Sequence, residues 1–158
     1  MVTVTVANKI AAPVDRVFAL FTDLDHCAGL VTGIKKIEVL TAPPFGLRTR
    51  WLETREVMGR EVTEELEVTS FELNHAYTVT NDVHGARMDT HFTFEPAGAG
   101  TEVNIVFTLA PQTFLTMLAS PHGWTIAGKV RKAHQDDVMD YKRFAEGKSE
   151  VESREVGK

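Results

Sequence analysis

Residues 49–69 of the chain read TRWLETREVMGREVTEELEVT, two alternating patterns of polar and apolar residues that meet at Met58-Gly59. A two-residue turn at that point predicts a β-hairpin, because successive strand residues point to opposite faces of a sheet. The pairs expected on one face are Thr49 with Val68, Trp51 with Leu66, Glu53 with Glu64, and Arg55 with Val62. This face is mostly apolar and is expected to meet the core. The hairpin therefore places three charged residues, Glu53, Arg55 and Glu64, on an inner face.

Length, composition and charge restrict the class of protein. The 158 residues are 43% hydrophobic and 25% charged, which is typical of one globular domain with a substantial core. A net charge of −5 and a pI near 5.7 argue against nucleic acid and anionic membrane surfaces as partners. No apolar run approaches the roughly 20 residues that cross a bilayer. The oligomeric state, monomer or homodimer, stays open.

The single cysteine, Cys27, excludes an internal disulfide. The first residues lack the basic and long apolar regions of a signal peptide, so we expect a cytoplasmic location. The six histidines show no metal-ligand spacing such as HExxH, and we expect neither a metal nor a cofactor. These histidines are His26, His75, His84, His91, His122 and His134. Adjacent side chains on a helix do not face each other, so Cys27 beside His26 predicts a small buried thiol, not a nucleophile.

The segment before the hairpin predicts a strand, two short helices and a second strand. Val2, Val4 and Val6 alternate with threonines in an opening strand that ends near residues 11–12. Apolar residues at helical spacing follow Pro13, and residues 23–31 form a weaker second helical pattern. Residues 34–40 resemble a strand, and a proline-rich loop at 43–46 leads into the hairpin.

After the hairpin, residues 71–74 are expected to form a turn, and three further alternating segments extend the sheet. A turn at His84-Gly85 would pair Asn81 with Met88, Val79 with Thr90, and Tyr77 with Phe92. Val103, Ile105, Phe107 and Leu109 then face inward on the last strand. Read across the whole sheet, these registers predict three layers on the inner face. They are Thr49, Val68, Tyr77, Phe92 and Ile105; then Trp51, Leu66, Val79, Thr90 and Phe107; then Glu53, Glu64, Asn81, Met88 and Leu109.

Beyond Pro111 the apolar spacing becomes helical. Residues 113–119 predict one or two helical turns, which end at a break around residues 120–123. A longer helix is expected from Trp124 to Ala145, with Gly147 as its end. Its apolar stripe comprises Ile126, Ala127, Val130, His134, Tyr141 and Phe144. The charged residues 147–158 read as a disordered tail, so a single domain is expected over residues 1–146.

Three short segments resemble the START/birch-pollen-allergen superfamily, also called SRPBCC, and in particular its bacterial polyketide cyclase/dehydrase and lipid-transport members. They are IAAPVDRVF at 10–18, GLRTRW at 46–51, and FEP at 94–96 followed by GTEV at 100–103. The resemblance covers residues 2–146. It implies an α+β helix-grip fold, in which a curved antiparallel sheet of about seven strands wraps around the long C-terminal helix. A cavity lies between them in this family, whose members bind lipids, sterols, polyketides or hormones. A minority catalyse cyclisation, aromatisation or dehydration, and no catalytic motif is shared.

If the resemblance holds, the inner face of the sheet and one side of the helix would line a ligand cavity. The alternative for the apolar members is plain core, and the alternative for the charged members is a salt bridge at the solvated end of the sheet. We expect Tyr77 to be the better ligand contact among the aromatic residues, because its hydroxyl needs a partner. The candidate ligand-binding residues are Trp51, Glu53, Arg55, Glu64, Leu66, Tyr77, Val79, Asn81, Met88, Thr90, Phe92, Phe107, Val130 and His134.

His134 carries two interpretations. In a lipophilic cavity it would serve as a general base or as a hydrogen-bond donor to a ligand. Alternatively its ring packs at the cavity edge, with Asp137 in solvent. Both residues fall within the apolar stripe of the helix.

Three functional hypotheses follow. The first is a non-catalytic binder or carrier of a small hydrophobic molecule with at least one polar group. The second is a polyketide-type cyclase, aromatase or dehydratase, in which Glu64 or His134 would move protons while Arg55, Asn81 or Tyr77 held a carbonyl oxygen. The third is a protein-interaction module that uses the outer face of the sheet, although that face is highly charged and lacks an aromatic patch.

Overall fold

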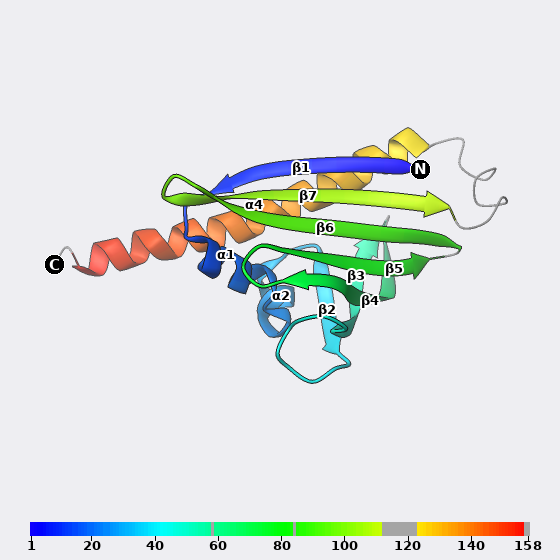
Figure 1. Ribbon diagram of the computed structural model, residues 1–158, viewed down its shortest axis with the longest axis horizontal. Helices are drawn as coiled ribbons and strands as arrows, with labels where there is room; N and C mark the ends of the chain where they lie inside the picture. The colour runs from blue at the N-terminus through cyan, green and yellow to red at the C-terminus, as the bar shows by residue number, and fades with distance from the viewer. Residues whose placement is uncertain (58, 84, 112–122, 157–158) are drawn as a thin grey trace.

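A seven-stranded antiparallel sheet carries the fold, in the order β1-β7-β6-β5-β4-β3-β2. The structure, a computed structural model, describes residues 1–57, 59–83, 85–111 and 123–156; the predicted helical turns at 113–119 lie outside the described residues. The long helix α4 runs along the sheet, and α1 and α2 lie side by side near one end of it (Figure 1). This architecture confirms the predicted helix-grip fold. The elements are β1 Val2–Ile10, α1 Val14–Phe21, α2 Leu24–Leu30, β2 Ile34–Val39, β3 Arg50–Val57, β4 Arg60–Glu72, β5 Ala76–Val83, β6 Ala86–Ala97, β7 Gly100–Pro111 and α4 Gly123–Val156.

The hairpin β3–β4 has the predicted register. Trp51 lies opposite Leu66, and Glu53 lies opposite Glu64. Gly59 in the turn has a φ of 76°, a left-handed conformation that glycine adopts without a steric penalty. The pairs β5–β6 and β6–β7 also have their predicted registers, as the positions of their turns require.

The pairing of β4 with β5 corrects one prediction. Val68 was expected beside Tyr77, but it lies opposite Val79, while Tyr77 lies opposite Phe71. The reason is that β4 continues through residues 71–72, which were expected to form a turn, and a bulge follows Val68. The register is displaced by three residues next to the turn, where Tyr77 lies opposite Phe71, and the bulge reduces the displacement to two at Val68. The inward residues of β4 up to Val68 therefore keep the predicted face. Phe71 packs against the core, and its ring lies edge-on to that of Phe18 with 5.9 Å between the ring centroids.

The helix α4 passes through Gly147, where the sequence predicted its end, and continues to Val156. Residues 147–156, expected as a disordered tail, are therefore helical. Val138, Tyr141 and Ala145 on this helix are buried against the sheet and α1, whereas Phe144, which was assigned to the apolar stripe, is exposed. The stripe thus runs at steps of three and four residues from Val130, and position 144 falls beside it. The domain boundary at residue 146 stays a prediction.

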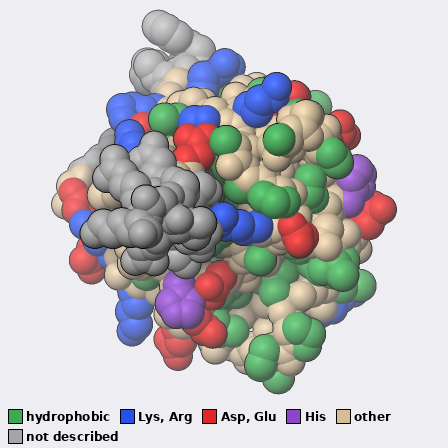
Figure 2. Space-filling model, turned by 90° about the vertical axis from the view of Figure 1, so that its left-hand side faces the viewer, with side chains coloured by type: hydrophobic (Ala, Val, Ile, Leu, Met, Phe, Trp, Pro, Cys, Tyr) green, Lys and Arg blue, Asp and Glu red, His purple; other side chains and the backbone are tan. Residues whose placement is uncertain are grey.

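The surface at the end of the molecule where the C-terminus lies is mixed in character. Acidic and basic side chains are interspersed there, with hydrophobic side chains between them (Figure 2). None of the described helices combines the length and the apolarity that crossing a bilayer requires.

Candidate functional site

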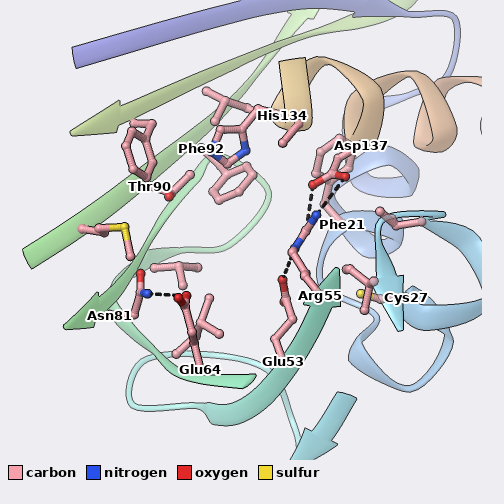
Figure 3. A pocket seen from close by; sticks show the side chains of 18 of the residues that line it. Phe21, Cys27, Glu53, Arg55, Glu64, Asn81, Thr90, Phe92, His134 and Asp137 are labelled. Carbon is pink, nitrogen blue, oxygen red and sulfur yellow. Dashed lines mark hydrogen bonds and ion pairs between the residues drawn. The ribbon is translucent and has the colours of Figure 1, made fainter. Parts of the chain in front are cut away.

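A cavity of about 370 Å³ lies between the inner face of the sheet, α4 and the two short helices. All fourteen residues that the sequence proposed for ligand binding line it, and Figure 3 labels several of the polar ones, among them Glu53, Glu64 and His134. The sheet supplies most of them because inward side chains recur at every second strand residue. Their part in binding a ligand stays a prediction, but their convergence on one space follows directly from the registers.

Twelve residues that line the cavity were not among the ligand-binding residues proposed from the sequence. The helices α1 and α2 contribute several, and the stripe of α4 contributes more than was proposed. A signal existed for those on α1 and α4, which occupy apolar helical stripes. The residues not proposed are Phe21, Leu24, Cys27, Val31, Ile34, Phe45, Val57, Ile105, Ala133, Asp137, Val138 and Tyr141.

One wall of the cavity holds a cluster of three charged side chains. Arg55 donates from Nε to Glu53 Oε1 at 2.6 Å, and from Nη1 and Nη2 to the two carboxylate oxygens of Asp137 at 3.2 and 2.7 Å. Trp51 Nε1 donates to the second oxygen of Glu53 at 3.1 Å. The cluster joins β3 to α4 across 82 residues of sequence, as the dashed lines in Figure 3 show.

This cluster is mostly buried. The side chains of Glu53, Arg55 and Asp137 are 13%, 29% and 14% exposed. The interpretation that placed Asp137 in solvent is therefore wrong, and the salt bridge is not the solvated rim that the position near the turn suggested. Sequence could not locate the partner of Asp137, because the contact depends on how α4 crosses the sheet.

Electrostatics keep the Arg55–Asp137 pair ionised. Burial opposes the charge on Arg55, but Asp137 and then Glu53 raise its pKa above the ordinary value. Burial raises the pKa of Asp137, while the adjacent Arg55 guanidinium acts in the opposite direction. The paired geometry of the two Arg55–Asp137 hydrogen bonds is the strong arrangement for this ion pair, so we assign Asp137 as a carboxylate at neutral pH.

Glu64 lies on the adjacent strand β4, where its Oε2 accepts a hydrogen bond from Asn81 Nδ2 at 2.8 Å. Glu64 and Glu53 are direct cross-strand partners, yet their side chains turn to different elements (Figure 3). Like charges in this position repel, and the separate partners keep the two carboxylates apart. Space lined by polar groups remains between them.

His134 lies on α4 beside the cavity, with its ring centroid 5.6 Å from that of Phe107. Burial, reinforced by the positive charge of Arg55, lowers the pKa of His134 to about 4. The imidazole is therefore neutral at physiological pH. In that form one ring nitrogen donates a hydrogen bond and the other accepts one.

Tyr77 and Cys27 have partners within the protein. The Tyr77 hydroxyl donates to the carbonyl oxygen of Phe21 at 3.4 Å, and its ring stacks on Phe92. The hydroxyl thus needs no ligand, contrary to the argument that favoured it. Cys27 is buried, as predicted, and burial raises the pKa of its thiol to about 11, although a hydrogen bond from Tyr141 acts in the opposite direction. Within the described part of the chain, no three His, Cys, Asp or Glu side chains are placed to hold a metal ion.

Comparisons with known proteins agree on the fold. The model of the family described as polyketide cyclase / dehydrase and lipid transport matches residues 1–143. A comparison with curated proteins found no match.

Solved structures with the same fold include a START superfamily protein from Mycobacterium smegmatis, with a TM-score of 0.77, 12% identity, and coverage of 92% of this chain and 97% of that chain. Ara h 8.0201 has a TM-score of 0.75 and 13% identity, with 92% and 98% covered. The di-domain ARO/CYC StfQ from the steffimycin biosynthetic pathway has a TM-score of 0.78 and 11% identity, with 94% of this chain and 51% of that chain covered. Identities this low show a shared fold alone.

Proposed function

The chain belongs to the polyketide cyclase/dehydrase and lipid transport family of the SRPBCC superfamily, and from this premise we propose that it binds a small hydrophobic molecule with a polar group. The ligand would occupy the cavity between the sheet and α4. A role in carrying lipids or polyketide-like aromatic compounds, and a cytoplasmic location, are parts of this proposal.

The cavity itself is the observation that supports binding. Protein interiors are close-packed and contain few voids larger than a water molecule, so a space of about 370 Å³ is not ordinary core. Its volume falls in the range of small-molecule sites. Its walls are mostly apolar, with a small number of polar groups that can fix the orientation of a ligand.

An enzyme of the cyclase, aromatase or dehydratase type is the second candidate, because Glu64 and His134 line the same cavity. A general base works best when its pKa lies near the working pH. With a pKa of about 4, His134 would be a weak base at neutral pH, and its neutral ring suits hydrogen bonding to a ligand better. Proton transfer would then depend on Glu64 alone. Because only one of the two proposed proton-transfer groups suits that role, binding without catalysis is the better-supported function.

Gentle native mass spectrometry of the freshly purified protein tests the binding proposal. Wild-type protein is expected to carry a co-purified small molecule. Val130→Trp, which places an indole at the cavity wall on α4, should reduce the bound fraction, while Arg131→Trp on the exposed side of the same helix should not. Wild-type protein that is empty after purification, and that takes up no added hydrophobic compound, would contradict the proposal.

The enzyme candidate has its own measurement. Glu64→Gln retains the shape of the side chain and its acceptor oxygen for Asn81 but removes the carboxylate. If the protein turns over a polyketide-type substrate, this variant should lose turnover while it retains ligand binding. Equal turnover in both proteins would exclude Glu64 as the proton-transfer group.

A further inference from the structure

The charged groups that line the cavity have an excess of carboxylates. Among the described lining residues, Glu53, Glu64 and Asp137 are acidic, Arg55 is the single Lys or Arg side chain, and His134 is neutral at physiological pH. Charge interactions are stronger inside a protein than in water, because the effective dielectric constant is lower. A ligand anion placed in this cavity would therefore meet repulsion that its hydration shell in water does not impose.

Arg55 offers such an anion only the two guanidinium N–H groups that Glu53 and Asp137 leave, and its positive charge is already balanced by these two carboxylates. Its Nε is bonded to Glu53, and both terminal nitrogens are bonded to Asp137. A ligand carboxylate that displaced Asp137 would leave a buried carboxylate without its cation, which is costly. The guanidinium is thus engaged by the protein's own acids.

The polar groups away from Arg55 include several hydrogen-bond acceptors. Glu64 presents a carboxylate held in place by Asn81, whose amide carbonyl is a further acceptor. His134 adds one accepting ring nitrogen from α4. Figure 3 shows Glu64 and Asn81 on one wall and His134 on another, with the cavity between them. An O–H or N–H group on the ligand is complementary to these acceptors.

We propose that the cavity selects hydrophobic ligands whose polar end is a neutral or cationic hydrogen-bond donor, and that it rejects anionic amphiphiles such as fatty carboxylates. This inference rests on the proposed binding function and narrows the class of ligand. The donor end would lie against Glu64, Asn81 and His134, and the hydrocarbon portion would lie against the aromatic wall formed by Phe92 and Phe107.

A matched series of ligands tests the inference by titration calorimetry at pH 7.5. Decanol, decylamine and decanoate share one chain, and at this pH the amine is protonated and the acid is ionised. Wild-type protein should bind decanol or decylamine at least about tenfold more tightly than decanoate. The ratio of the decanol affinity to the decylamine affinity shows whether a neutral or a cationic donor is preferred. Decanoate binding as tight as that of decanol and decylamine would overturn the inference while leaving the binding function intact. If none of the three binds, the binding function itself fails.

Two variants separate the charge of the cavity from the charge of the whole protein. Asp137→Asn removes one acid from Arg55 and should raise decanoate affinity about tenfold, with decanol affinity changed by less than about twofold. Glu64→Gln should shift the preference in the same direction. Glu65→Gln is the matched control, because Glu65 neighbours Glu64 on the outer, exposed face of β4. An equal shift in the control variant would show that the preference comes from net charge, and it would overturn the assignment to this cavity.

Discussion

The ion pair between Arg55 and Asp137 provides the sharpest test of how deeply the charged cluster lies. Arg55→Met retains much of the length of the side chain but leaves Glu53 and Asp137 facing each other without a cation. Breaking a fully buried pair by removing one partner costs about 3–5 kcal/mol. Arg55 is 29% exposed, so solvent screens part of this effect, and we expect the variant to lose about 3 kcal/mol of unfolding free energy.

Urea unfolding followed by tryptophan fluorescence measures this loss. With a slope of about 2 kcal/mol per molar urea, the transition midpoint should fall by about 1.5 M at an unchanged slope. Asp137→Leu alone should also destabilise the protein, because it leaves Arg55 with Glu53 as its only acid partner in this cluster. The double variant should recover part of the loss, because an apolar pair of similar volume removes the desolvation cost on both sides.

Arg50→Met is the matched control. Arg50 lies on the same hairpin but on its outer face, where its ion pair with Glu65 has both side chains about half exposed. Exposed pairs contribute about 0–1 kcal/mol, so this variant should shift the midpoint by less than about 0.5 M. Equal shifts for Arg55→Met and Arg50→Met would refute the argument that the inner cluster is desolvated.

Three further predictions concern other parts of the fold. The pKa of His134 is about 4 in the folded protein and 6.5 ordinarily, so between these pH values the unfolded chain binds more protons than the folded one. The free energy of unfolding should therefore fall as the pH falls from 6.5 to 4, by roughly 3 kcal/mol once the whole range is crossed. His134→Gln should remove this acid loss, as urea midpoints at pH 7.5 and 4.5 would show. Gly100→Ala should destabilise by more than about 2 kcal/mol, because the added Cβ would lie 2.6 Å from the carbonyl oxygen of Ile10, whereas Gly128→Ala in open space on α4 should stabilise by about 0.5–1 kcal/mol in thermal unfolding. Cys27 should resist alkylation in the native state and react after unfolding, as mass spectrometry would record.

Each of these outcomes has a clear contrary result. Asp137 has a raised pKa, which acts against the loss that His134 causes on acidification, so the informative quantity is the difference between wild type and His134→Gln. Identical pH profiles for the two proteins would refute the lowered pKa of His134. Gly100→Ala with wild-type stability would contradict the close approach of β1 to the start of β7. Rapid native labelling of Cys27 would show that its thiol is exposed.

The sequence predicted the faces of the strands well because strand periodicity is local. Each hairpin turn marked by a glycine fixed a register, and the pairs Glu53–Glu64 and Asn81–Met88 follow from turn position alone. The register between β4 and β5 was wrong because β4 continues through residues 71–72, which the sequence suggested as a turn, and because no local pattern announces the bulge after Val68.

The depth of the charged cluster could not be predicted for a different reason. Arg55 and Asp137 are 82 residues apart, and their contact is set by the path of α4 over the sheet. Helical periodicity placed Asp137 on the inward stripe, but an inward position near a helix edge is compatible with either solvent or a partner. The end of α4 was also mislocated, since Gly147 weakens a helix without necessarily ending it.

The arrangement of Glu53 and Glu64 bears directly on why the cavity exists. A direct cross-strand pair of like charges on an inner face is unfavourable, and an apolar pair there would add to the core. The structure instead gives each carboxylate a separate set of partners, Arg55 and Trp51 for one and Asn81 for the other. Local rules of stability are most often broken at functional sites, where the loss is balanced elsewhere in the fold. Repulsion between these two carboxylates opposes closure of the space between them, and a ligand with a donor group is the occupant that would relieve it.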